Sequence, residues 1–237
     1  MGCAVATLAL AAVVVSLFHP RIRGARMAAW RSATHRSLYQ VGGGVRAFHE
    51  DRGALPPWAE GGEATVAGPG NPAPAWLTAC LPHLGRGEVY EAYDLTVPFD
   101  APGNAGVAGR VVDEFLCPDA DYRDRTREGG FGLAHIAGNV RLLGEEGPRT
   151  FDGVTDGASH TLLAGQVGGF PRPWADPTNL RDTADGIGGS PHQFGGSFNG
   201  GTAVMCDGSV HFLSEAIDPA VLAALGTPDG GEDVGAF

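Results

Sequence analysis

The strongest hydrophobic pattern lies in the N-terminal quarter of the chain and predicts one long helix in two parts. Residues 3–18 contain no charged side chain, and their length lies between that of a signal-peptide core and a full membrane span. Beyond them, apolar side chains recur every three or four positions, the spacing of one helix face. We expect an uncleaved membrane anchor over residues 1–20 and an amphipathic continuation of the helix over residues 21–53. The predicted face carries Met27, Trp30, Thr34, Leu38, Val41, Val45 and Phe48.

Glycine and proline residues modify this helix without removing it. Pro20 lacks the amide hydrogen that a helix interior uses, so it predicts a kink at the junction of the two parts. The triplet at residues 42–44 weakens a helix by roughly 1 kcal/mol per glycine relative to alanine. Tertiary packing must therefore hold that stretch in place. The helix should stop near Gly53, just before the two prolines at positions 56 and 57.

The remaining residues, 54–237, predict a globular α+β domain. Residues 59–74 are rich in glycine and proline and predict a loop, whereas residues 76–93 predict a broken helix. Residues 169–201 form a long irregular excursion, and loops of that length are usually functional or mobile. Apolar runs predict strands over residues 107–118, 131–138 and 160–168.

Residues 202–213 predict a β-hairpin. Asp207-Gly208 suits a two-residue type I′ turn, whose twist matches that of the flanking strands. In that register Ala203, Met205, Val210 and Phe212 share one apolar face. Asp218 is then expected to cap a helix that begins at Pro219. The expected pairs are Cys206 with Ser209, Met205 with Val210, Val204 with His211, and Ala203 with Phe212.

Charge divides the chain into two regions. Up to residue 52 there are seven Arg against Glu50 and Asp51, a net of +5, while the rest carries −16, which gives the total of −11. An acidic body argues against nucleic acid as a partner, because binding there depends on neutralising phosphates. The basic helix face suits anionic lipid headgroups beside the predicted anchor.

Five segments, taken in order, resemble a known bacterial family. This is the prepilin-type family of unknown function with a His-x(nine)-Asp-Gly motif, whose members look like oversized type II pseudopilins. The matching segments are residues 23–57, 76–95, 115–121 (FLCPDAD), 151–167 and 206–235. The resemblance implies a pilin-like α+β fold, with a long N-terminal helix packed on an antiparallel β-sheet and large loop insertions. It assigns signature positions to Cys117, Pro118, Asp156, Gly157, Asp207 and Gly208.

The sequence departs from the family pattern at three points. No prepilin cleavage motif precedes the helix, and no acidic residue lies in the predicted anchor. Ser197 stands where the motif has histidine, with His192 nearby in the same glycine-rich stretch. The arginines that follow the anchor would, by the positive-inside rule, keep the body in the cytoplasm, whereas a pilin-like protein requires the reverse. We follow the family resemblance on orientation.

Candidate catalytic and metal-binding groups are few. Ser159 and His160 suggest a nucleophile and base, but neighbours on a strand point to opposite faces, so we expect no dyad. Asp152 and Asp156 are candidate calcium ligands, together with acids at positions 119, 121 and 124, although an EF-hand spacing is absent. No histidine spacing suggests metal ligation, so His83, His135 and His211 are expected to be structural; His192 could approach His211 near the hairpin.

The tryptophans and cysteines leave alternatives open. Trp58, Trp76 and Trp174 could form a sugar-stacking surface or pack in the core. Cys80 and Cys117 could form a disulfide in an exported body or stay as buried free thiols, because spacing alone does not settle connectivity.

The expected function is that of a non-catalytic, membrane-anchored, pilin-like structural or interaction protein of the bacterial envelope. Its single spanning helix would lie in the inner membrane, with the globular domain in the periplasm or outside the cell. Its partners would be the membrane and further copies or other pilin-like subunits, with no cofactor beyond the calcium candidate. The alternative is a cell-surface module that binds a glycan or another ligand through residues 169–201; an envelope hydrolase ranks third.

Overall fold

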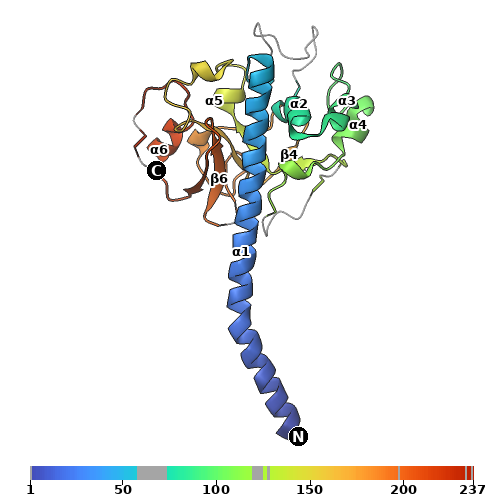
Figure 1. Ribbon diagram of the computed structural model, residues 1–237, viewed down its shortest axis with the longest axis vertical. Helices are drawn as coiled ribbons and strands as arrows, with labels where there is room; N and C mark the ends of the chain where they lie inside the picture. Colours follow the sequence, from blue (N-terminus) through green and yellow to red (C-terminus); the bar gives the residue numbers. More distant parts are fainter. Residues whose placement is uncertain are drawn as a thin grey trace.

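A long helix and a sheet form the frame of the protein. The computed structural model describes residues 2–57, 74–118, 125–126, 129–196, 198–232, 234–235 and 237, with only the backbone described for residues 2–23. Helix α1 (Gly2–Arg52) runs unbroken through Pro20 and ends where Gly53 adopts a positive φ of 67°. Figure 1 shows its C-terminal half lying along the globular body and its N-terminal half projecting away from it. The division of the chain at residue 20 stays a prediction.

A five-stranded sheet supports the packed half of α1. The strand order is β5-β2-β3-β6-β7, antiparallel at every pairing except β2 with β5. A separate two-stranded sheet joins β1 and β4. The predicted α+β, pilin-like class with a long N-terminal helix on a sheet is thus confirmed. The strand bounds are β1 Leu133–Ala134, β2 Ile136–Asn139, β3 Leu162–Gln166, β4 Arg172–Pro173, β5 Leu180–Arg181, β6 Gly200–Met205 and β7 Val210–Ser214.

Close packing holds α1 on the sheet. Leu38, Val41 and Val45 are completely buried in the main core. A Cβ at Gly42 would lie 2.7 Å from the Val204 side chain on β6, so only glycine allows the helix to lie this close. Packing therefore supplies the stability that glycine removes from the isolated helix, as the sequence predicts.

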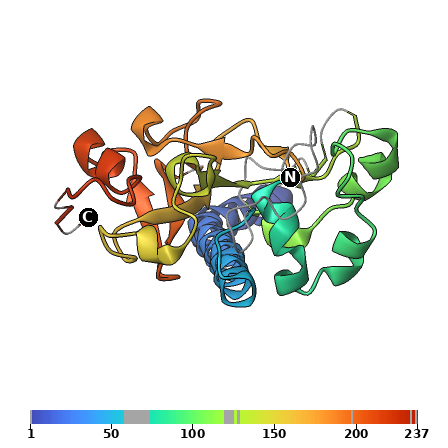
Figure 2. The ribbon, with the colours of Figure 1, turned by 90° about the horizontal axis from the view of Figure 1, so that it is seen from above.

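Short helices form a lobe on one side of α1, and the C-terminal part of the chain lies on the other side (Figure 2). Residues 76–93 are a broken helix as predicted. The segment 107–118 is not a strand: it contains the end of α4 and a 3-10 turn, because Pro102 begins a helix at its N1 position. The helices are α2 Trp76–Cys80, η1 Leu81–Leu84, α3 Gly87–Glu91, α4 Pro102–Ala108, η2 Asp113–Phe115, α5 Val140–Leu143, η3 Phe151–Gly153, η4 Thr183–Asp185 and α6 Pro219–Ala224.

The C-terminal hairpin forms, but its register differs by one residue from the expected one. Val204 pairs with Val210 and Ala203 with His211, and the Met205 carbonyl accepts a bond from the Gly208 amide. The loop has three residues, with Gly208 at φ 89°, which is the turn-plus-bulge geometry of longer hairpin loops. A one-residue shift exchanges the faces of a strand.

This shift changes which side chains the hairpin buries. Val210 now packs with Val204 on the core cluster that includes α1, whereas Ala203 and Met205 face a second cluster with Leu213. Phe212, expected in the core, is 48% exposed. The predicted cap is confirmed, since the Asp218 side chain accepts a bond from the Ala220 amide at the start of α6.

Candidate functional site

The projecting part of α1 leaves the N-terminal end of the predicted apolar face uncovered. Every described residue from 24 to 29 is exposed, and Met27 is 41% exposed. Trp30 is half-buried, with the Arg26 guanidinium 5.1 Å from its ring centroid. Arginine above an indole ring is a favourable cation–π arrangement. Aromatic and arginine side chains together are typical of protein interfaces.

The point where α1 enters the body is marked by a second arginine. The Arg31 guanidinium lies 5.0 Å from the Phe198 ring centroid and 5.5 Å from that of Phe212. One cation thus contacts two rings, one of them on β7 and the other just before β6. These contacts tie the helix to the edge of the sheet at the lower limit of the body.

The signature residues Cys117 and Pro118 line a cavity of about 420 Å³ between α1 and the segment after η2. The Cys117 amide lies 3.2 Å from Nδ1 of the buried His135 side chain. The Cys117 thiol donates to the His135 carbonyl at 3.7 Å. On the helix side, the Ser37 hydroxyl donates to the Leu116 carbonyl. The signature here fixes the position of a chain segment against α1, and His135 has the structural role expected of it.

Three cysteines have described side chains, and none of them forms a disulfide bond. Cys80, Cys117 and Cys206 are all buried and unbridged, so the Cys80–Cys117 disulfide is not formed and the alternative of buried thiols holds. Burial raises the pKa of the Cys80 and Cys206 thiols well above the ordinary value. A protonated, buried thiol is a poor nucleophile, which disfavours cysteine chemistry at these two positions.

The second signature pair, Asp156-Gly157, joins a turn to the C-terminal tail. The Asp156 carboxylate accepts bonds from the amides of Gly230 and Gly231 at 2.8 and 2.9 Å. Gly157 has a φ of 101°, which suits glycine in this turn. Backbone amides of the tail thus bind the Asp156 carboxylate. Asp152, the other candidate calcium ligand, lies in η3.

A calcium site gains no support from the described geometry. In the parts of the chain that the structure describes, no three or more His, Cys, Asp or Glu side chains gather closely enough to hold a metal ion. The acids at positions 119, 121 and 124 lie outside the described residues, as does Ser197, so the structure does not bear on them.

The third signature pair, Asp207-Gly208, closes the hairpin. The Asp207 carboxylate accepts bonds from the amide and the hydroxyl of Ser209, and that hydroxyl lies 3.0 Å from Nε2 of His211. The Asp207 amide donates to the Ala158 carbonyl, so the tip is also held against the turn before β3. His192 lies exposed in a turn after Pro191.

Ser159 and His160 do form a pair, contrary to expectation. Both lie in the turn before β3 rather than on a strand, and the Ser159 hydroxyl is 3.1 Å from Nδ1 of His160. The two side chains do not point to opposite faces, because β3 begins only at Leu162. Both side chains are exposed, and the described contacts supply no acid to orient the imidazole, so the pair lacks the third group of a catalytic triad.

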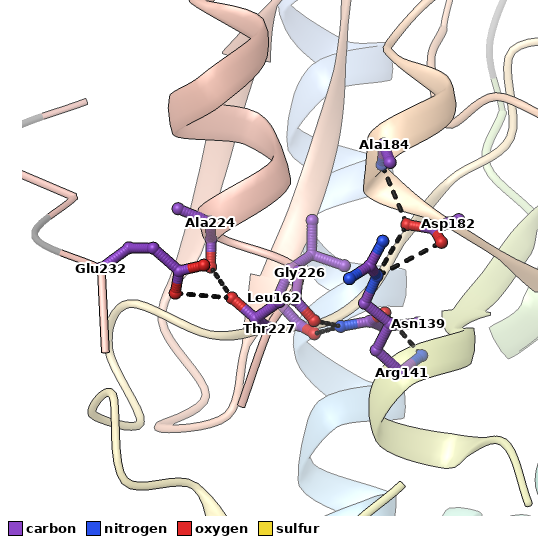
Figure 3. Close-up of polar contacts among 9 residues, drawn as sticks. All are labelled: Asn139, Arg141, Leu162, Asp182, Ala184, Ala224, Gly226, Thr227 and Glu232. Atoms are coloured by element: carbon purple, nitrogen blue, oxygen red, sulfur yellow. Dashed lines mark hydrogen bonds and ion pairs between the residues drawn. The ribbon is translucent and has the colours of Figure 1, made fainter. Parts of the chain in front are cut away.

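A polar network that sequence reasoning missed joins three parts of the chain (Figure 3). Buried Asn139 donates to the carbonyls of Leu162 and Gly226, both at 2.8 Å, and its own side-chain oxygen accepts from the Arg141 amide. The Arg141 guanidinium in turn pairs with Asp182 at 3.0 Å. Asn139 is the last residue of β2 and the N-cap of α5, and only the fold reveals its bonds to Leu162 and Gly226.

Electrostatics at the outer end of this network keep Asp182 ionised. Burial alone would raise the pKa of Asp182, but hydrogen bonds from Arg141 and from the Ala184 amide outweigh it and lower the pKa. The pair borders an open cavity of about 750 Å³ whose walls include Glu145, Glu146 and Asp229. The network therefore serves to fix α6 and η4 against the sheet.

Trp76 and Trp174 do not belong to a sugar-stacking surface. Trp76 and Trp174 are buried, and their indole nitrogens donate to the carbonyls of Asn179 and Arg110. Core packing is thus the correct alternative for these two, while Trp58 lies outside the described residues.

The predicted anchor, residues 1–20, lies outside the residues whose side chains the structure describes. A search of the described residues found no helix with both the length and the apolar composition that a membrane span requires.

Comparison with known proteins identifies a family but no named relative. A family model described as "Protein of unknown function (DUF1559)" matches residues 23–186. Comparison with curated proteins gives no match, and comparison with solved structures gives none either. The matched region extends from the projecting part of α1 to the end of η4, which is more than half of the chain. The protein therefore belongs to the DUF1559 family of proteins of unknown function.

Proposed function

We propose that the protein is a non-catalytic, membrane-anchored, pilin-like subunit of the bacterial cell envelope. The observation that carries the proposal is the projecting half of α1. It leaves the body as a continuous helix, exposes Met27 and leads towards the uncharged residues 3–18. The helix would be fixed in the inner membrane, with the globular domain in the periplasm or outside the cell.

Helix physics supports this role. A helix in water depends mainly on tertiary packing of one face, and the described residues 24–29 have no such packing. A bilayer would supply the missing environment for residues 3–18, since an apolar helix satisfies its backbone polar groups internally. Arg26 and Arg31 would then lie near the headgroups, where each basic side chain contributes about 1 kcal/mol on an anionic surface.

The finer assignment to the His-x(nine)-Asp-Gly group is also a proposal. The matched family region ends at residue 186, before the Asp207-Gly208 pair. What supports the assignment is the tight turn at that pair, in which Asp207 caps the Ser209 amide and Gly208 takes a positive φ. These two residue types are required by the turn whatever residue occupies position 197.

Membrane fractionation of the full chain tests the main proposal. We expect the protein to remain with the membrane pellet after alkaline carbonate extraction, and protease added to spheroplasts to digest the globular domain. The variant Leu10→Arg should release it, because an arginine at the centre of a span costs about 2.5–3.5 kcal/mol. Leu10→Val is the matched control and should stay in the pellet. Recovery of the unmodified chain in the soluble fraction would contradict the proposal.

A further inference from the structure

An apolar groove lies at the edge of the sheet opposite β5. Strand β7 is the last strand in the sheet order, and the groove between β7 and α6 has a volume of about 380 Å³. This volume is near the lower end for pockets that hold a whole small ligand. It suits a few large side chains presented by a partner. The lining residues are Phe212, Leu213, Ser214, Ala216, Ile217, Asp218, Val221 and Phe237.

The groove carries negative charge around its apolar lining. Glu215 and Asp218 are exposed on the segment that joins β7 to α6. From residue 182 to the last residue, 237, the sequence contains eight Asp and Glu and no Lys or Arg. A partner for this groove should therefore combine large apolar side chains with flanking positive charge.

The projecting segment of α1 has these properties. It presents Met27 and Trp30 three positions apart, on one helix face, with Arg26 beside them. Between residues 21 and 49 the sequence holds six Arg and no acid. An amphipathic helix whose apolar face enters a groove is a recurrent recognition mode, and Trp and Arg dominate the energy of such contacts.

The segment cannot reach the groove of its own chain. Helix α1 is continuous and its C-terminal half is fixed against β6, so residues 24–30 point away from the body (Figure 1). No residue of α1 is among the groove's lining. The complementary helix must therefore come from another molecule.

We infer that the groove between β7 and α6 binds the projecting α1 segment of a second copy of this chain. The inference rests on the proposed function, because anchoring in one membrane would align neighbouring helices. The contact joins two different surfaces, so a pair of copies keeps one free groove and one free helix. Such heterologous contacts build an open row of subunits or a closed ring rather than a symmetric dimer.

Site-specific cross-linking in membranes tests the inference. Met27→Cys and Ser214→Cys variants of the full chain are co-expressed with distinguishable tags, and membranes are oxidised with copper phenanthroline. We expect a disulfide between position 27 of one copy and position 214 of the other, in excess of the 27–27 and 214–214 products. Cys80, Cys117 and Cys206 are buried, which limits competing reactions of these three thiols.

Charge-reversal variants provide a second test of the contact between positions 27 and 214. Arg26→Glu and Glu215→Arg should each reduce the 27–214 product severalfold, and their combination should restore it. Ala28→Glu in the same helix, away from the Met27–Trp30 face, is the matched control and should leave more product than Arg26→Glu.

The outcomes separate the two proposals. Protein that pellets with membranes but gives only 27–27 product, or none, overturns this inference alone. Protein that does not pellet with membranes overturns the proposed function and this inference together.

Discussion

The two halves of α1 have the same periodic sequence and different surroundings. In the packed half, Leu38, Val41 and Val45 are completely buried against the sheet and the helical lobe. In the projecting half, Met27 lies on the same helix face and is 41% exposed. An apolar stripe therefore predicts where a partner is needed, but it does not tell whether that partner belongs to the same chain.

The glycine residues at positions 42–44 distinguish the packed half of α1 from the projecting half more clearly than the apolar face does. Gly42 and Gly44 allow the Val204 and Leu84 side chains to approach the helix backbone, and a Cβ at Gly43 would meet nothing within 4 Å. The projecting half has Gly24, which also has open space around it. The helix backbone thus lies directly against side chains of the body at Gly42 and Gly44, and at neither Gly43 nor Gly24.

Truncation of the packed stripe should have the largest effect. Leu38→Ala removes a completely buried side chain, and such changes cost about 2–5 kcal/mol of the free energy of unfolding. Urea denaturation of the full chain, followed by tryptophan fluorescence, measures the loss because Trp76 and Trp174 are buried in the same body.

Met27→Ala is the control in the projecting half. It should change the free energy of unfolding by no more than about 0.5 kcal/mol, as expected for an exposed position. Equal losses for the two variants would break the comparison, since they would mean that the body also stabilises the projecting half.

The sequence predicts the parts of the fold that rest on local chemistry. The helical period, the stop at Gly53, the broken helix from residue 76 and the Asp218 cap are all confirmed. Each depends on residues close together in the chain. The strand predicted over residues 107–118 fails because the same apolar run can pack as a short helix and a turn when Pro102 starts a helix before it.

The sequence-based predictions are wrong or incomplete where a one-residue shift in strand register, or a contact between distant residues, determines the structure. The hairpin uses a three-residue loop with Gly208 in the left-handed region, which exposes Phe212 and thereby helps to form the groove beside β7. The Ser159–His160 contact depends on the position at which β3 begins. The Asn139 network joins residues up to 87 positions apart, so no local sequence pattern predicts it.

Alanine substitutions at Gly42 and Gly43 should have opposite effects on stability, because one position faces the body and the other faces open space. At Gly42 a new Cβ would lie 2.7 Å from the Val204 side chain, so Gly42→Ala should destabilise the protein by about 1–3 kcal/mol through overpacking. At Gly43 the added methyl group is in open space, and Gly43→Ala should stabilise the helix by up to about 1 kcal/mol. The same urea titration measures both, and a destabilising Gly43→Ala would show that this face of the helix also packs.

A small effect is expected at the border of the two halves. The one guanidinium of Arg31 contacts the rings of Phe198 and Phe212, and a cation–π interaction at an exposed site contributes about 0.5–1 kcal/mol. Arg31→Ala should therefore cost up to about 1 kcal/mol. Arg26→Ala should cost less, because Arg26 contacts Trp30 within the same helix and no ring of the body. Double-mutant cycles with Phe212→Ala measure the coupling: a nonzero value for Arg31 and none for Arg26 places the limit of the packed half between these two arginines. Coupling of Arg26 to Phe212 would move that limit towards the N-terminus and shorten the free segment that a partner could bind.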